Sequence, residues 1–309
     1  MKLEELEKFE TVKRMLAELN LLTRSENTKL TYLKGLRAFF RFKGITNPDE
    51  FIESVKQRQN QNQLYKDFVL FLANENKAPK TVASWGASLK KFFAANGLPV
   101  TEKVQIKVYN VHEDELPKIE DLRKALELSD IKAKVAILLL ASSGMRIGEL
   151  RKLKISDIDL DSDPPKITIK GREAKERKSR ITFITPEAKK VLMEYLQKRQ
   201  AAGHVISPDS PVIATDDGRP MSYQNLEYII KNVFSKITSK EGKRYKLHAH
   251  SLRKWFKTQL ISAGVPGPIV DRLAGHSRYL AREYELYTED QLREWYKKGM
   301  YALIISEKL

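Results

Sequence analysis

The sequence contains no cysteine. This absence excludes disulfide bonds, thiolate metal sites and cysteine nucleophiles together. No apolar run approaches the ~20 residues that a membrane-spanning helix needs. The opening residues, MKLEELEKFE, also lack the apolar centre of a secretory signal peptide. Together these absences predict a cytoplasmic protein that does not enter a membrane.

Several common catalytic motifs are missing as well. There is no G-x-x-x-x-G-K-[ST] loop, which argues against a nucleoside triphosphatase, and no G-x-S-x-G elbow of a serine hydrolase. The histidines form no H-x-x-x-H pair, and no acidic cluster accompanies them, which argues against zinc and magnesium. We therefore expect no metal and no cofactor. The five histidines are His112, His204, His248, His250 and His276.

What the chain has in excess is positive charge. The net charge is +16 and the isoelectric point is about 9.6. Residues 1–112 carry 19 Lys and Arg against 12 Asp and Glu, and residues 113–309 carry 37 against 28. The excess is thus +7 and +9, spread over both halves, as expected if two folded units touch a polyanion. A Lys/Glu-rich solubilising surface would give the same charge, so charge alone leaves both interpretations open.

Apolar periodicity divides the chain into two parts. Helical spacing in 24–43, 64–73 and 79–96 predicts a small helical domain over residues 1–103, with the polar run QRQNQNQ (57–63) as a loop. Residues 101–116 lose that periodicity and end in an acidic cluster before Pro117. We therefore expect a linker over 104–116 and a second domain over 117–309.

The second domain is predicted to be mostly helical with a small antiparallel sheet. Residues 166–170 and 180–184 alternate in polarity around a charged turn, which favours a hairpin, and PVIAT (211–215) is a further short strand candidate. The helices expected here span 132–143, 186–199, 222–236, 251–263, 267–274 and 289–303.

Arginine, histidine and tyrosine gather in three short segments of the second domain: GMRIGEL (144–150), HAHSLRKWF (248–256) and LAGHSRYLAREYELY (273–287). Guanidinium and imidazole donors of this kind can surround a phosphate as charge builds on its oxygens. Each segment also has a plainer explanation: an exposed helix salt bridge, a capping histidine or a packing tyrosine. Trp255 is assigned to packing.

R-x-x-E-L, then H-x-x-R, then G-H-S followed by tyrosine resembles the tyrosine recombinase (phage integrase) family, and the likeness covers about residues 15–300. It implies a helical core-binding domain followed by a catalytic domain. It also implies that Arg146, His250, Arg253 and His276 hold the scissile phosphate and that Glu149 orients Arg146. Cleavage would need no metal and would leave a 3′-phosphotyrosine link.

The same resemblance assigns a general acid. In the family, a hairpin lysine protonates the leaving 5′-oxygen, and Lys170, directly before Gly171, fits this position best. Lys175 and Lys178 lie in the same turn and remain alternatives.

The nucleophile is chosen among Tyr279, Tyr284 and Tyr287, which all follow His276 closely. Tyr284 keeps the family's distance to the next helix, whereas Tyr287 would need an insertion before it and a deletion after it. Tyr284 is therefore preferred over Tyr287, and Tyr279 comes third.

The function expected from the resemblance is site-specific DNA recombination, as integration, excision or dimer resolution. The partners would be double-stranded DNA with paired inverted half-sites and four copies of this chain on two sites. The segment after residue 288 would dock on a neighbouring protomer. The alternatives are a type IB topoisomerase, a catalytically silent DNA-binding protein of the same fold, and a structural protein with a basic surface. Only the enzymes would leave protein covalently attached to DNA.

Overall fold

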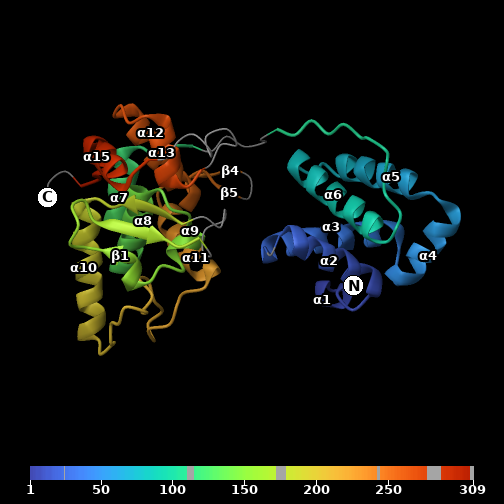
Figure 1. Ribbon diagram of the computed structural model, residues 1–309, viewed down its shortest axis with the longest axis horizontal. Helices are drawn as coiled ribbons and strands as arrows, with labels where there is room; N and C mark the ends of the chain where they lie inside the picture. The colour runs from blue at the N-terminus through green and yellow to red at the C-terminus, as the bar shows by residue number, and fades with distance from the viewer. Residues whose placement is uncertain (24, 110–114, 172–178, 242–243, 277–286, 307–309) are drawn as a thin grey trace. The chain divides into compact units, whose positions relative to one another are not determined.

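The computed structural model describes residues 1–23, 25–109, 115–171, 179–241, 244–276 and 287–306 (Figure 1). The chain divides into two compact units, Met1–Glu113 and Asp114–Leu309. Helices dominate both, and the second also holds a three-stranded antiparallel sheet. The predicted fold class, mainly α with a small antiparallel sheet, is confirmed.

The first unit is a bundle of helices. The polar run 57–63, expected as a loop, is mostly helical: α4 continues to Arg58, and α5 begins at Gln61. The chain turns at Gln59, whose backbone is left-handed with φ of 51°. Val55 and Tyr65 on either side are buried, and of the polar residues between them Asn60, Gln61 and Asn62 are half-buried. The helices are α1 (Leu3–Leu6), α2 (Glu10–Leu22), α3 (Glu26–Lys43), α4 (Pro48–Arg58), α5 (Gln61–Asn74) and α6 (Pro79–Ala95).

Aromatic rings fill the core of the first unit. The Phe39 ring meets that of Phe68 edge-on, with centroids 5.3 Å apart and planes at 76°, the arrangement that ring quadrupoles favour. Gly35 lets α3 approach α6, because a β-carbon there would overlap the side chain of Ser88. After α6, Val104 and Ile106 also pack against this core. The other buried rings are Tyr65, Phe40, Phe92 and Phe93.

The second unit is built around α8 (Ile131–Ser143), which is buried from Val135 to its end. Helices α10 (Pro186–Ala201) and α12 (Ala249–Ser262) pack against α8. Trp255 of α12 is 2% exposed, so its assignment to packing is confirmed. The remaining elements are α7 (Ile119–Glu127), α9 (Ile147–Leu150), η1 (Ile155–Asp157), α11 (Tyr223–Phe234), β4 (Lys240–Glu241), β5 (Arg244–Tyr245) and α13 (Gly267–Ala274).

The sheet of the second unit runs in the order β1 (Ile158–Asp159), β2 (Lys166–Ile169), β3 (Arg180–Phe183). The predicted hairpin is confirmed, and Ile169 faces Arg180 in its register. The strand expected at 211–215 is wrong, because this segment makes only isolated bridges. Its backbone bonds partly to other backbone and partly to side chains: the Val212 N–H donates to the Leu153 carbonyl at 2.9 Å, Arg199 donates to the Pro211 carbonyl at 2.8 Å, and the Ala214 N–H donates to the Tyr195 hydroxyl at 3.2 Å.

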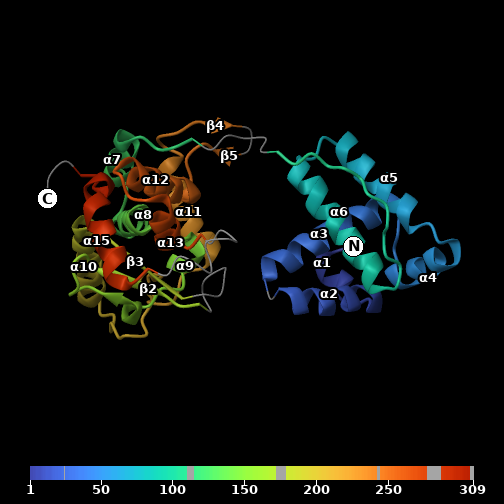
Figure 2. The ribbon, with the colours of Figure 1, turned by 45° about the horizontal axis from the view of Figure 1, so that its top comes forward.

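The C-terminal elements, α15 (Glu289–Gly299) and η2 (Met300–Leu303), fold back on their own unit, where α15 packs on α12, α13 and β3 (Figure 2). Tyr296 is fully buried and donates to the Ser142 carbonyl at 2.8 Å. The N–H of Ile305 donates to Glu187 Oε2 at 3.0 Å. Residues 289–306 thus pack largely on their own unit, although Tyr301 is 67% exposed. The expected docking of the segment after residue 288 on a neighbouring protomer stays a prediction.

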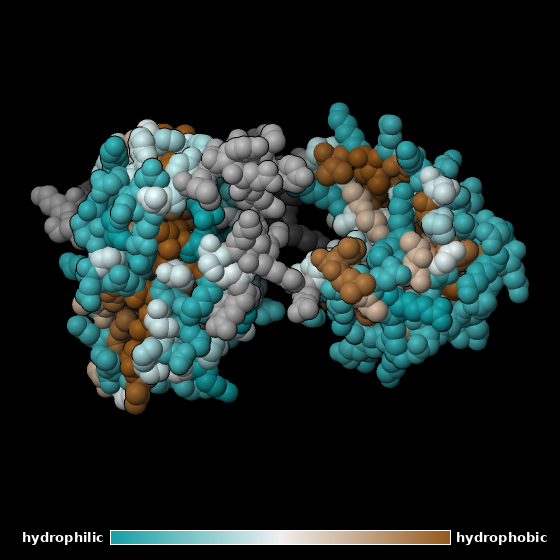
Figure 3. Space-filling view, in the orientation of Figure 1, coloured by the Kyte–Doolittle hydropathy of each residue, from teal (hydrophilic) through white to brown (hydrophobic). Residues whose placement is uncertain are grey.

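Figure 3 shows the surface of each unit as mostly hydrophilic, with smaller apolar patches between polar side chains. None of the helices that the structure describes is both long and apolar enough to cross a membrane.

Candidate active site

Arg146 is held at the start of α9 by Glu149. Helix α8 ends at Gly144, which adopts a left-handed backbone with φ of 63°, and the chain then turns into α9 with Arg146 as its N-cap. Glu149 Oε2 accepts the Arg146 backbone N–H at 2.7 Å, and Oε1 accepts from Nη1 at 3.1 Å. One carboxylate therefore fixes both the backbone and the side chain of Arg146. Glu149 is 3% exposed, so this is not an exposed salt bridge.

A second arginine, Arg180 at the start of β3, completes the pairing of Glu149. Its two terminal nitrogens donate to the two carboxylate oxygens at 3.0 and 2.8 Å, and its Nε donates to the Leu273 carbonyl at 3.2 Å. Burial alone would raise the pKa of Glu149, but the hydrogen bonds and charges of Arg180 and Arg146 hold that pKa below its ordinary value. Sequence reasoning missed Arg180, and its only local signal is an arginine opening an apolar strand.

The turn after α13 brings the third segment to Arg146. Arg146 Nη2 donates to the Gly275 carbonyl at 3.1 Å. Gly275 has φ of +70°, and a β-carbon there would lie 2.6 Å from Arg180 Nε. Only glycine leaves room for the guanidinium in this left-handed turn. Arg180 and Arg146 thus join α9, β3 and the Gly275–His276 turn.

Arg253 reaches the same place from α12. Its side chain is 2% exposed, and Nη1 donates to the carbonyl of Gly144, the residue that ends α8. Arg253 thus binds the backbone two residues before Arg146, and Arg146 binds the backbone of the Gly275–His276 turn. The structure thus brings together Arg146, Arg253 and His276, which the sequence singled out.

His276 is an uncharged donor or acceptor at neutral pH. Its pKa lies at about 4, because burial and the positive charges of Arg253, Lys257 and Arg146 outweigh the attraction of Asp271. Lys257, on α12, was not singled out by the sequence. Its Nζ lies 3.1 Å from His276 Nδ1 and 2.6 Å from Asp271 Oδ1.

His250 occupies the first turn of α12 and is exposed. The N-cap of that helix is His248. Its Nδ1 lies 3.1 Å from the Ser251 hydroxyl, so the His248 side chain contacts the first turn of α12. The two imidazole centroids are 6.3 Å apart. His250 is thus exposed, on the helix that carries Arg253.

Lys170 follows β2 directly, and its Nζ lies 2.5 Å from Oδ1 of Asp157, a carboxylate that is 1% exposed. The alternatives Lys175 and Lys178 lie outside the described residues, as do Tyr279 and Tyr284. Tyr287 is described and lies partly buried against the hydrophobic core of the second unit.

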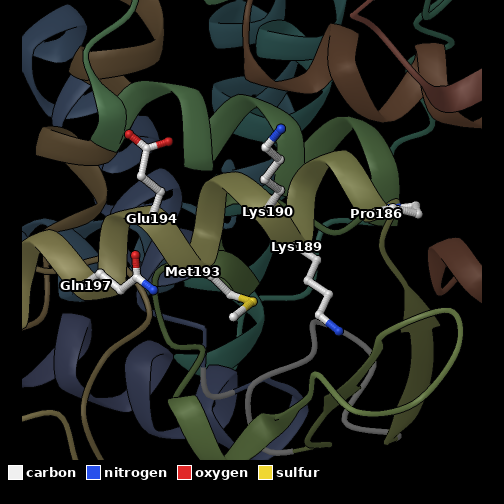
Figure 4. Close-up of a pocket in the computed structure, with 6 residues that line it drawn as sticks. All are labelled: Pro186, Lys189, Lys190, Met193, Glu194 and Gln197. Carbon is white, nitrogen blue, oxygen red and sulfur yellow. The ribbon is translucent and has the colours of Figure 1, made fainter. Parts of the chain in front are cut away.

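Within the described ranges, no group of three or more His, Asp or Glu side chains is placed to hold a metal ion. The pocket in Figure 4 is an open depression along α10 and contains none of the catalytic candidates. Its lining residues are Pro186, Lys189, Lys190, Met193, Glu194 and Gln197.

Comparison with known proteins gives consistent matches. The Phage integrase family model matches residues 109–291. Tyrosine recombinase XerC of Leptospira interrogans is 26% identical over 285 residues, 89% of this chain and 88% of the relative. Tyrosine recombinase XerD of Listeria innocua is 26% identical over 292 residues, with 89% and 92% covered.

Two solved structures share the fold. An integrase of the transposon Tn1549, in complex with transposon right end DNA, covers 93% of this chain and 98% of its own, with a TM-score of 0.66 and 19% identity. A lambda integrase dimer bound to a core site covers 88% and 95%, with a TM-score of 0.61 and 17% identity.

Proposed function

Because the chain belongs to the phage integrase family and is a site-specific DNA recombinase that cleaves and rejoins DNA, we propose that it does so with Tyr284 as nucleophile. The choice of Tyr284 rests on its spacing in the sequence. The observation that supports a reaction at phosphate is the convergence of Arg146, Arg253 and the His276 turn, joined through Glu149 and Arg180. Such a cluster offers forked donors and positive charge to one phosphate, which is what phosphoryl transfer requires.

In the proposed reaction the Tyr284 phenol oxygen attacks the scissile phosphorus, and the bond from phosphorus to the 5′-oxygen breaks. The phenol loses one proton, and the 5′-oxygen gains one from Lys170. To act as this acid, Lys170 must leave Asp157, from which its Nζ lies only 2.5 Å away. Arg146, Arg253, His250 and His276 hold the phosphate oxygens. The reverse attack by a 5′-hydroxyl of the partner strand completes the exchange without a metal or a cofactor.

DNA is the partner of this enzyme. The integrase of Tn1549 and lambda integrase were both solved on DNA, and both units of this chain carry excess positive charge. We propose that the helical first unit is the core-binding domain, which grips the duplex while the second unit cleaves it. Four copies would act on paired inverted half-sites, in the cytoplasm.

The test is the covalent adduct. A pool of nicked duplexes with random sequence would be incubated with the protein and run on a denaturing gel, because a nick lets the 5′ fragment leave and traps the tyrosine link. Wild type should leave protein on DNA, and Tyr284→Phe should leave none, since only one ring can lie in line with the leaving group. Tyr287→Phe is the matched control and should keep the adduct.

Mapping the peptide that remains on DNA after proteolysis identifies the nucleophile directly. A modification at Tyr287 would overturn the choice of Tyr284. No adduct with any duplex would favour the silent DNA-binding protein. An adduct with plasmid relaxation by the isolated monomer, and no joining between two sites, would favour the topoisomerase.

A further inference from the structure

Lys257 lies where two helices meet beside the candidate active site. It follows Arg253 by four residues on α12, so the two side chains share one face of that helix. Its Nζ lies 2.6 Å from Asp271 Oδ1 on α13 and 3.1 Å from His276 Nδ1. The Lys257 and Asp271 side chains are 25% and 13% exposed, and the His276 side chain is 41% exposed. The proposed reaction has no role for Lys257.

The contact decides which imidazole nitrogen of His276 carries the proton. A lysine ammonium has three donors and no acceptor, so Nδ1 at 3.1 Å must accept and therefore has no proton. A neutral imidazole carries one N–H, which leaves it on Nε2. Asp271 Oδ1 would favour the opposite form, but it lies 3.9 Å from Nδ1, beyond hydrogen-bond distance, and is engaged by Lys257.

We propose that Lys257 is a positioning residue, which fixes His276 as the neutral Nε2–H form so that the ring donates a hydrogen bond to the scissile phosphate. The donation to phosphate rests on the proposed function, whereas the position of the proton does not. In this form His276 cannot act as a base through Nε2. It stabilises the phosphate as a donor, and Lys257 holds it in that role.

The electrostatics around the ring agree with this role. Burial lowers the pKa of His276 most, the charges of the described residues Arg253, Lys257 and Arg146 lower it further, and Asp271 raises it. The pKa of about 4 keeps His276 neutral at physiological pH. A neutral ring has only one donor, so the choice of nitrogen matters. Without Lys257 a neutral ring would be free to turn its Nδ1–H toward Asp271 and its Nε2 lone pair toward the phosphate.

The proton position can be measured without DNA. Nitrogen-15 labelled histidine distinguishes protonated from unprotonated ring nitrogens by NMR, and a His276→Asn sample assigns the His276 signals among the five histidines. At pH 7 the wild type should show Nε2 protonated and Nδ1 bare. A proton on Nδ1, with or without one on Nε2, would overturn the proposal.

The variant Lys257→Met removes the cation and keeps much of the side-chain length. Loss of this positive charge beside Asp271 should raise the pKa of His276, and above that pKa the proton should move to Nδ1. Lys257→Arg should restore the wild-type pattern, because a guanidinium is also a donor without acceptors. An unchanged His276 spectrum in Lys257→Met would overturn the proposal.

Cleavage of nicked duplex then gives a readout that a merely structural role would not move. In Lys257→Met the rate should be near that of wild type at a pH below the raised His276 pKa, where a charged ring presents Nε2–H. It should fall by about 10²-fold above that pKa, as for loss of one transition-state donor. The cleavage rate of the wild type should show no such fall over the same pH range. Equal losses at all pH values would overturn the role in positioning.

The control Lys198→Met removes an exposed lysine of the same unit, 60% exposed and paired with Glu194, and should leave rate and pH profile unchanged. Thermal unfolding of each variant separates loss of folding from loss of the donor. A wild type that forms no adduct but shows the expected NMR pattern would refute the proposed function alone. An active wild type with Nδ1 protonated would refute only the role of Lys257.

Discussion

The two units bury different kinds of side chain. Among the described residues of the first unit, the buried polar side chains are the uncharged Thr11, Ser88 and Asn96, set in a core of aromatic rings. The second unit buries six charged side chains as well: Glu149, Asp157, Arg180, Glu187, Arg199 and Arg253. Burying charge costs free energy even when it is paired.

Three of these charges, Glu149, Arg180 and Arg253, lie at the candidate active site. Each is bound to a part of the chain far away in the sequence, so each fixes the position of one element against another. Among the described residues, the first unit is held mainly by apolar packing, with no charged side chain buried in its core. The second unit holds Arg146, Arg180 and Arg253 near one another, and the buried pair of Glu149 with Arg180 fixes Arg146 in this arrangement.

The largest effect on stability should come from Glu149→Gln. Without the carboxylate, the guanidinium of Arg180 stays buried without its counter-charge, which costs about 3–5 kcal/mol. The free energy of unfolding should be measured in urea in a Trp85→Phe background, because the two remaining tryptophans, Trp255 and Trp295, both belong to the second unit. Cleavage should also fall severely, since Arg146 loses its orienting acid.

Two controls sharpen this result. Glu194→Gln breaks an ion pair of the same unit whose side chains are 51% and 60% exposed, and it should cost far less stability than Glu149→Gln. Adding Arg180→Met to Glu149→Gln removes the orphaned charge, so the double variant should be more stable than Glu149→Gln alone. If Glu149→Gln costs no more than Glu194→Gln, the two units do not differ in the way argued above.

Much of the fold was predictable because its periodicity is local. The helix at 79–96 and the hairpin at 166–170 and 180–184 follow from spacing within each segment. The errors arose where contacts with residues distant in the sequence determine the local structure. Residues 57–63 look like a loop because none of their side chains is apolar, but Asn62 is bound to Thr101 and Glu102 across the unit. Residues 211–215 look like a strand, but their backbone bonds to Leu153 and to side chains of α10 rather than to a neighbouring strand.

The site shows the same limit. Arg146 and Glu149 are three residues apart, so the sequence could anticipate their contact. Arg180 meets Glu149 across 31 residues and Lys257 meets His276 across 19, and no local pattern specifies such contacts. Lys170 was chosen by its place at the end of a strand, but its contact with Asp157 depends on how η1 folds against the sheet.

A smaller effect is expected from Gly275→Ala. The left-handed backbone at φ of +70° costs a residue with a β-carbon about 1–3 kcal/mol, and the new methyl would also press on Arg180. Gly203→Ala is the matched control, because Gly203 has φ of +88° but nothing within 4 Å of the added carbon. The free energies of unfolding of both variants should be measured in urea.

The difference between these two variants isolates the contact with Arg180. Gly275→Ala should be the less stable variant, and it alone should slow cleavage, because it displaces the guanidinium that joins α9, β3 and the His276 turn. Equal stability and equal cleavage in the two variants would mean that the turn yields easily and that Arg180 does not depend on glycine at this position.

The smallest effect concerns the first unit, where charge acts only at an edge. Asp49 accepts hydrogen bonds from the backbone N–H groups of Glu10 and Thr11 at 3.2 and 2.9 Å and from the Thr11 hydroxyl at 2.7 Å, so it caps the start of α2. Asp49→Ala should cost about 1 kcal/mol, as for loss of a helix cap. The part of the tryptophan signal in urea unfolding that is lost on Trp85→Phe belongs to the first unit, because Trp85 is the one tryptophan of that unit.

The pH dependence of this contribution has a definite sign. Burial raises the pKa of Asp49, but the hydrogen bonds from Thr11 outweigh it and leave that pKa below its ordinary value of 3.8. The stabilisation is therefore complete at neutral pH and disappears as the pH falls through the lowered pKa, because the unfolded chain binds the proton first. The wild type should lose its stability advantage over Asp49→Ala in acid.

Glu53→Ala, which removes a carboxylate that is 67% exposed, should show neither the cost in stability nor the pH dependence. An Asp49→Ala cost as large as that of Glu149→Gln would mean that the first unit also depends on charge for its shape.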